Sequence, residues 1–349
     1  MNEAKNILLV RTDRIGDVVL SLPLVGIIKK HYPNSKVSIL LKNYTKELAA
    51  NYPGLDNVIV LKEKKGNTFL FPNINEIKKH NFDSCIIVYP TFKIALILFL
   101  SKIKNRIGSG YRWYSFLFNK KIYEHRKYGE KHELEFNVAM LKLIGIDEKI
   151  NESNVSFNLQ PAHNSVQFVN ELLVDSNYNE KLTSVIIHPG SAGSAVDLPI
   201  PKLKELASLM AQQLSVNIIL TGNEFEKSIC DNINSDNKFI NLAGRLNLSQ
   251  LIAIINKADL LIANSTGPIH IAAALGKNVI GFYPKIAACS PDRWGPYTSK
   301  KIIFSPTIEC GNCTRKQCEK LNCMNNININ DVFESAKKLA VTCNVTEMK

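Results

Sequence analysis

The stretch that decides the fold is ADLLIANSTGPIHIAAALGKNVIGFY, residues 258–283. An apolar run of strand length leads into a Ser-Thr-Gly-Pro turn, a helical pattern follows, and a second apolar run comes after a glycine. Ser265 or Thr266 can cap the helix, Pro268 suits its first position, and Gly276 suits the position just past its end. The stretch therefore predicts one strand–helix–strand unit of a parallel sheet.

The same alternation runs through both halves of the chain, on either side of a polar, aperiodic segment at 151–165. We predict two doubly wound parallel-sheet α/β domains, 1–160 and 161–329, facing across a cleft, which is the default place for a ligand. Pro23 predicts a kink or a late start in the first helix. Strands are expected at 6–11, 37–41, 58–61, 84–89, 184–188, 216–221, 259–263 and 278–283. Helices are expected at 17–31, 44–51, 201–214, 224–234, 248–257, 268–275 and 330–342.

The net charge of +12 is concentrated in the first half, where residues 1–165 hold 25 Lys and Arg against 15 Asp and Glu. This excess favours an anionic partner, such as a membrane surface or a phosphorylated substrate. We do not expect nucleic acid, because neither zinc-finger spacing nor the aromatic-basic signature of an RNA-binding sheet is present. A solvated lysine-rich surface is the plain alternative.

Two further features bear on the compartment. No signal-peptide pattern begins the chain, so we expect a cytoplasmic protein with reduced cysteines. The most apolar run, IALILFL at 94–100, is too short to span a bilayer. We interpret it as a core helix, with a membrane-docking element as the alternative. Cys310, Cys313, Cys318 and Cys323 have a spacing that could hold a structural zinc ion or leave reduced thiols.

Three loops after predicted strands are candidates for binding an anion or a nucleotide. The helix that starts at Thr266 and Gly267 offers backbone N–H groups and the positive end of its dipole, with His270 in its first turn. VIIHPGSAGSA, at 185–195, has the small residues that let a phosphate approach the backbone. An acid in LTGNEFE, Glu224 or Glu226, could hold a ribose. For each loop, a purely structural role in a turn or cap is the alternative.

The segment RTDRIGDVVLSLP begins at Arg11 and places two acids and two arginines between a strand and a helix. Asp17 at that position could accept a proton from a hydroxyl group. Arg11 and Arg14 would attract an anionic substrate, and Asp13 could pair with either arginine. The alternative for Asp17 is a helix N-terminal acid that the helix dipole stabilises.

Taken together, RIGDVVLSLP, HPGSAGSA, NSTGPIHIAAALG and SPDRWGPY resemble glycosyltransferase family nine, the heptosyltransferases of lipopolysaccharide core assembly. KHELEFNVAMLKLIGI (131–146) and CGNCTRKQCEKLNCM (310–324) are similar to further segments of that family. The resemblance implies the GT-B architecture, with the last helix, within 330–349, packing back on the first domain. It also implies inverting transfer from ADP-heptose without a metal or other cofactor.

The resemblance assigns roles by position. Asp17 is the implied general base. The first domain is expected to bind an anionic lipopolysaccharide-core acceptor at the inner membrane face, and the enzyme is expected to be a monomer that lies in the cytoplasm or peripherally on that membrane. Acceptor-binding candidates are Arg11, Arg14, Arg106 and Arg112. Donor-binding candidates are His188, Gly190, Ser191, Ser194, Glu226, Ser265, Thr266, Gly267, Pro268, His270 and Arg293.

Two departures from the family pattern leave alternatives open. Ser265 stands where members often carry Asp, and Val196 stands where they often carry Lys or Arg, a charge that Arg293 could replace. A transferase that uses another nucleotide sugar for a core or capsular glycan is therefore the main alternative. A non-catalytic module that only binds a nucleotide sugar is a second alternative. NAD-linked redox chemistry lacks its glycine fingerprint.

Overall fold

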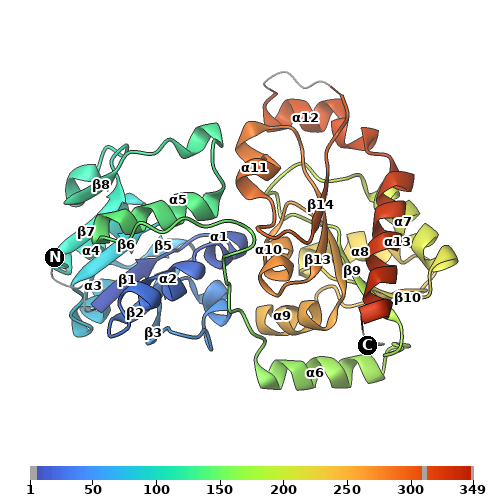
Figure 1. The fold of residues 1–349 in the computed structure, drawn as a ribbon, viewed down its shortest axis with the longest axis horizontal. Coiled ribbons are helices and arrows are strands. Elements are labelled where there is room, and N and C mark those ends of the chain that lie inside the picture. The colour runs from blue at the N-terminus through green and yellow to red at the C-terminus, as the bar shows by residue number, and fades with distance from the viewer. Residues whose placement is uncertain (1–5, 309–312, 347–349) are drawn as a thin grey trace. The chain divides into compact units, whose positions relative to one another are not determined.

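The computed structural model describes residues 6–308 and 313–346. The chain divides into two compact units: the residues up to Arg126 together with Lys131–Asn158, and Lys127–Glu130 together with the residues from Leu159 onward. Each unit contains one six-stranded sheet whose strands all run parallel (Figure 1). The predicted fold class of two parallel-sheet α/β domains is confirmed.

The first sheet has the strand order β3-β2-β1-β6-β7-β8. The strands alternate with helices because buried aliphatic runs such as Ile7–Val10 alternate with amphipathic segments. The strands are β1 (Asn6–Val10), β2 (Lys36–Leu41), β3 (Asn57–Val60), β6 (Ser84–Ile87), β7 (Asn105–Ser109) and β8 (Lys120–Ile122), with a small antiparallel pair, β4 (Glu63–Lys64) and β5 (Asn67–Thr68). The helices are α1 (Ile15–Val19), α2 (Pro23–His31), α3 (Leu70–Lys79), α4 (Phe92–Leu100) and α5 (Glu133–Ala139), and the 3-10 turns are η1 (Asn43–Leu48), η2 (Ser115–Leu117), η3 (Arg126–Tyr128) and η4 (Met140–Ile144).

The second sheet repeats this order as β11-β10-β9-β12-β13-β14. Its strands are β9 (Thr183–His188), β10 (Val216–Leu220), β11 (Ile240–Asn241), β12 (Leu260–Asn264), β13 (Asn278–Phe282) and β14 (Lys301–Phe304). Its helices are α6 (His163–Val174), α7 (Ile200–Gln213), α8 (Lys227–Ile233), α9 (Leu248–Lys257), α10 (Gly267–Ala274), α11 (Pro291–Trp294), α12 (Arg315–Leu321) and α13 (Ile329–Thr346), with the 3-10 turns η5 (Glu224–Glu226), η6 (Ala287–Cys289) and η7 (Cys323–Asn326).

In each sheet the strand order reverses beside the first strand. β1 lies between β2 and β6, and β9 lies between β10 and β12. Ligands of open parallel sheets bind beyond the carboxyl ends of the strands at such switch points. Helix α1, directly after β1, carries Asp17. Most of the predicted donor residues follow β9 and β12, whereas Glu226 follows β10 and Arg293 follows β13. The topology thus places the candidate residues where a ligand is expected.

The C-terminal helix is part of the core of the second unit. α13 packs against α7 and β9, and its side chains Ile329, Val332 and Phe333 are buried in the core of the second unit. The helix therefore belongs to the second unit, and its expected packing on the first domain stays a prediction. The physical reason is its continuous apolar face, which the helices and strands of the second unit cover.

Two other local expectations are confirmed, whereas the helix expected at 44–51 is the 3-10 turn η1 and the helix expected at 224–234 is divided into η5 and α8. Pro23 starts α2 after α1 ends at Val19, so the predicted interruption is confirmed. Gly276 follows α10 with a φ of +71°, and Lys277 N donates to Ala272 O, as in a Schellman cap. Within the described ranges, no helix has the length and apolar character that crossing a membrane requires.

Candidate functional site

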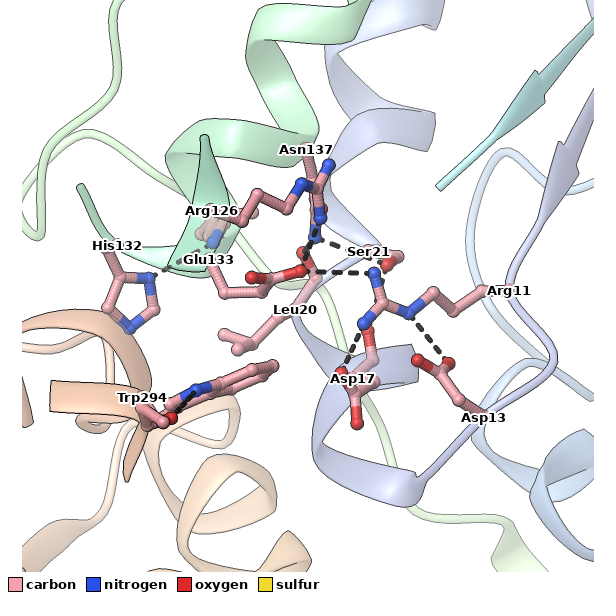
Figure 2. A network of polar contacts seen from close by, with 12 residues as sticks. Arg11, Asp13, Asp17, Leu20, Ser21, Arg126, His132, Glu133, Asn137 and Trp294 are labelled. Carbon is pink, nitrogen blue, oxygen red and sulfur yellow. Dashed lines mark hydrogen bonds and ion pairs between the residues drawn. The ribbon is translucent and has the colours of Figure 1, made fainter. Parts of the chain in front are cut away.

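The loop after β1 is built around Arg11, whose side chain is buried. Its Nε donates to Asp13 Oδ1 at 2.7 Å, its Nη2 donates to Asp17 Oδ1, and its Nη1 lies 3.5 Å from Glu133 Oε1 (Figure 2). Asp17 lies in the first turn of α1, with 14% of its side chain exposed. One guanidinium therefore fixes the orientation of the candidate base while leaving part of its carboxylate accessible.

Burial and charge set the protonation of this cluster. Burial alone would lower the pKa of Arg11, but the charges of Asp13, Asp17 and Glu133 raise it, so the guanidinium stays charged. Burial raises the pKa of Asp13 to about 7, and the charge of Asp17 adds to this against the opposing effect of Arg11. Asp13 therefore takes up a proton near neutral pH.

A second arginine, Arg126 in η3, contacts the cluster through side chains of α5. Arg126 Nη1 donates to Glu133 Oε1 and, at 3.0 Å, to Asn137 Oδ1. Asn137 Nδ2 in turn donates to Leu20 O at 3.0 Å, which ties α5 to the end of α1 (Figure 2). Sequence reasoning did not assign Glu133 or Asn137 a role, although the quoted segment 131–146 contains both.

The structure separates the four arginines that were predicted to bind the acceptor. Arg11 is 1% exposed and holds acids, so it offers no surface to an acceptor. Arg106 Nε donates to Leu117 O at 2.8 Å and its Nη1 donates to Ile103 O at 2.5 Å, which commits it to the fold. Arg14 and Arg112 are exposed. Contact of these two arginines with an acceptor stays a prediction.

In the second unit, β9 ends at His188, which is buried beside η5. Its Nδ1 lies 3.0 Å from Thr221 Oγ1, and its Nε2 lies 3.8 Å from Glu226 Oε2. Burial lowers the pKa of His188 more than Glu226 raises it, so the ring is neutral at neutral pH. The neutral imidazole can serve as a hydrogen-bond partner but not as a fixed cation.

Glu226 forms a capping box with Asn223, in which Glu226 Oε2 accepts from Asn223 N at 2.8 Å. Its carboxylate also explains the glycine at 190: a Cβ there would lie 1.9 Å from Glu226 Oε1. The cap role considered for this acid is thus present in the structure. A ribose contact of Glu226 stays a prediction.

The end of β12 is held by Asn264, which is fully buried. Its Oδ1 accepts from Leu198 N at 2.8 Å, and its Nδ2 donates to Pro189 O at 2.6 Å. Both ends of the loop 189–198 are thereby fastened beside the start of α10. Sequence reasoning passed over Asn264; the only signal was a polar residue at the end of an apolar strand.

The start of α10 has the form expected of an anion site. Thr266 is the N-cap residue in extended backbone, but its side chain makes no capping hydrogen bond, so the expected side-chain cap by Thr266 is not formed. Ser265, Thr266 and His270 are buried. The loop 189–198 and the start of α10 therefore lie together at the switch point. The structure brings into this region the predicted donor residues His188, Gly190, Ser191, Ser194, Ser265, Thr266, Gly267, Pro268 and His270.

A cation reaches this loop from a distant segment. Arg315, the first residue of α12, donates through Nη1 to Gly193 O and through Nε to Glu319 Oε1 at 2.8 Å. Ala192 and Gly193 both have positive φ, +46° and +74°, which turns this part of the backbone sharply. Val196, where a basic residue was missing, is buried in the apolar core. Arg315 supplies a positive charge that the sequence pattern did not reveal.

Asp197 follows Val196 and faces the same arginine. Burial raises the pKa of Asp197 to about 6, against the opposing effects of Ser191 and of the charge of Arg315. Arg293, the predicted replacement cation, lies in α11 with its guanidinium 4.8 Å from the ring centre of Trp294. Tyr283, at the end of β13, anchors α11 by donating to Trp294 O at 3.0 Å.

The described cysteines of the cluster show no metal geometry. Cys318 and Cys323 are buried in the apolar core of the second unit, and Cys313 is half-buried. Within 6–308 and 313–346, no three His, Cys, Asp or Glu side chains are arranged to hold a metal ion. Cys310 lies outside the described residues.

Comparison with known proteins identifies the family. The family model of glycosyltransferase family 9 (heptosyltransferase) matches residues 73–324, which is more than half of the chain. The chain belongs to glycosyltransferase family 9. This family 9 member is therefore a glycosyltransferase enzyme. Asp17 precedes the matched residues, so its role is not settled by the match.

The relatives of this glycosyltransferase are distant but cover most of its length. A Haemophilus influenzae protein named as a possible glycosyltransferase is 29% identical over 86% of this chain and 89% of its own. The lipopolysaccharide core heptosyltransferase OpsX of the same species is 26% identical over 86% of this chain and 84% of its own.

Solved structures share the fold of this glycosyltransferase. A family 9 glycosyl transferase from Veillonella parvula aligns with a TM-score of 0.82 and 17% identity, covering 98% of this chain and 99% of its own. The ADP-heptose lipopolysaccharide heptosyltransferase II of Escherichia coli aligns with a TM-score of 0.79 and 18% identity, covering 97% and 99%. The expected GT-B architecture is therefore confirmed as a fold.

Proposed function

We propose that this enzyme transfers a heptose from ADP-heptose to an acceptor of the lipopolysaccharide core, with inversion at the anomeric carbon. The family assignment and the printed functions of the relatives support the sugar and the acceptor. We assign acceptor binding to the first unit and donor binding to the second unit. The observation that carries the assignment is that Asn264 holds the loop 189–198 beside the start of α10, at the switch point of the second sheet.

The donor's diphosphate would lie at the start of α10. Backbone N–H groups of that first turn can stabilise negative charge, and the helix dipole adds to this effect. Arg315 and Arg293 provide the positive charge that Val196 does not. Since charge grows on the diphosphate as the glycosidic bond breaks, these groups would stabilise the transition state more than the bound donor.

Asp17 is the proposed general base. Its carboxylate removes the proton of the acceptor hydroxyl as that oxygen attacks the anomeric carbon and the diphosphate leaves. Arg11 pairs with Oδ1 of Asp17, so we assign proton acceptance to Oδ2. Arg11 becomes a positioning residue in this proposal, and Arg14 and Arg112 stay as acceptor contacts.

The experiment that tests the base is the Asp17→Asn variant, followed by chromatography of released ADP and by calorimetry of ADP binding. Turnover should fall by about 10²–10⁴-fold while ADP binding stays unchanged, because the variant loses only proton acceptance. Asp13→Asn is the matched control, since it removes another acid from the same guanidinium. Near-normal turnover of Asp17→Asn would refute the assignment of the base.

The alternative function is transfer of a different sugar, and Ser265 favours it. Ser265 is buried, and its hydrogen bond with the Tyr283 phenol lowers the pKa of Tyr283 against the larger, raising effect of burial. A small neutral side chain therefore occupies the position where family members often carry Asp. A screen of nucleotide sugars by thermal shift and then by turnover decides between the two. Faster turnover with another nucleotide sugar than with ADP-heptose would establish the alternative, and binding without turnover would indicate a non-catalytic module.

A further inference from the structure

Helix α4 is apolar on both of its faces. Ile94, Ala95, Ile97 and Leu98 are buried in the core of the first unit, as expected for a surface helix. Its outer face should then be polar, but it carries the exposed side chains of Phe92, Phe99 and Leu100, with Lys93 as the charged residue of the helix. The core explains only half of this apolar sequence.

The loop that follows β7 continues this apolar face. Trp113 is 73% exposed and Phe116 is 67% exposed. The rings of Phe92 and Trp113 stack with centroids 4.9 Å apart. The guanidinium of Arg106 lies 5.1 Å from the ring centre of Phe99. We call Phe92, Phe99, Leu100, Trp113 and Phe116 the aromatic surface.

The segment that carries the aromatic surface has charges of one sign. Residues 92–121 contain seven lysines and arginines and no aspartate or glutamate. Lys93, Lys102, Lys104 and Arg112 are exposed. Exposed aromatic rings within a field of basic side chains match an anionic bilayer, because rings settle at the headgroup level and each nearby cation attracts anionic lipid.

We propose that the aromatic surface docks the first unit onto an anionic phospholipid bilayer. Trp113 and Phe116 enter the headgroup region, and Lys93 and Lys104 contact lipid phosphates. The proposal rests on the proposed function in one respect: an acceptor that carries lipid lies in such a bilayer. A protein partner would be expected to face some acids as well as bases here, and residues 92–121 offer none.

The test is co-sedimentation of the purified full-length enzyme with vesicles, without donor or acceptor. Vesicles of phosphatidylglycerol with phosphatidylethanolamine are compared with vesicles of phosphatidylcholine. We expect binding to the anionic vesicles only. The double variant Trp113→Ser/Phe116→Ser and the double variant Lys93→Glu/Lys104→Glu should each bind about tenfold or more weakly. Val174→Ser removes an apolar side chain of the second unit that is even more exposed, and this variant should bind like the wild type.

Turnover on a lipid-free acceptor separates this proposal from its competitors. It should be unchanged in both double variants, because the aromatic surface contacts lipid. Equal binding of the wild type to both vesicle types, or unchanged binding of the double variants, overturns the proposal. Loss of turnover on the lipid-free acceptor also overturns it, since the rings would then be binding sugar. Vesicle binding does not depend on which sugar is transferred, so a failure of the proposed function is recognised separately.

Discussion

At the scale of single residues, one buried guanidinium organises the loop after β1. Arg11 binds two aspartates, but the two differ in environment, since burial raises the pKa of Asp13 to about 7. The sequence indicated that Asp13 could be an ion-pair partner and that Asp17 could be a base. It could not show that Arg11 is buried, because Glu133, which completes the cluster, lies 122 residues away.

The raised pKa of Asp13 predicts a pH dependence of stability. Folded protein holds this proton up to about pH 7, whereas the unfolded chain releases it near pH 4, so the contribution of Asp13 to stability falls as pH rises between these values. Asp13→Asn should remove this decline. The Tm of the variant minus that of the wild type should therefore increase from pH 5 to pH 8 in thermal unfolding experiments.

Asp56→Asn is the control for this measurement. The pKa of Asp56 is lowered, because a hydrogen bond from Val37 N and the charge of Lys29 outweigh burial. Asp56 is therefore ionised in both states across pH 5–8, and its variant should differ from the wild type by a constant amount. A constant difference for Asp13→Asn as well would show that Asp13 titrates in the ordinary range of an aspartate.

At the scale of elements, the candidate residues lie just after strands, and side chains from distant elements contact these loops. Local patterns predicted β12, α10 and the Pro23 interruption, since caps, glycines and proline act within a few residues. They did not predict the role of α12, whose Arg315 reaches a loop 122 residues earlier in the chain. That contact depends on how α12 packs, which no local pattern encodes.

Arg315→Gln tests the proposed cation at this loop. ADP binding should weaken about ten- to a hundredfold, which corresponds to the loss of one charge-assisted hydrogen bond to phosphate. Adenosine binding should not change, because adenosine lacks the diphosphate. Calorimetry with both ligands makes the comparison, and Lys316→Gln on the same helix is the matched control. Equal losses for ADP and adenosine would show that Arg315 supports only the shape of the loop.

At the scale of the whole molecule, both units have the same strand order and each carries its candidate residues at the switch point. The two units differ in charge, because the first half of the chain carries most of the excess of basic residues. This asymmetry agrees with the proposal that one unit faces an anionic acceptor while the other binds the nucleotide.

The proposed use of N–H groups and arginines predicts that divalent metal is dispensable. Turnover should persist after dialysis against EDTA and should not rise when Mg²⁺ is restored, because fixed groups of the protein already stabilise the leaving diphosphate. The same assay in a metal-dependent glycosyltransferase serves as the control. Loss of turnover with EDTA and recovery with a divalent cation would contradict this mechanism.

The sequence by itself determined the α/β class, the two parallel sheets and most strand positions, because hydrophobic periodicity and turn residues act locally. It also marked the loops that carry Asp17 and Thr266. Only the tertiary structure decided that Arg11 is buried, that Asn264 fastens both ends of the loop 189–198, and that α13 packs within the second unit. The physical reason is that side-chain burial and pairing depend on contacts between segments far apart in the chain, which local residue patterns do not specify.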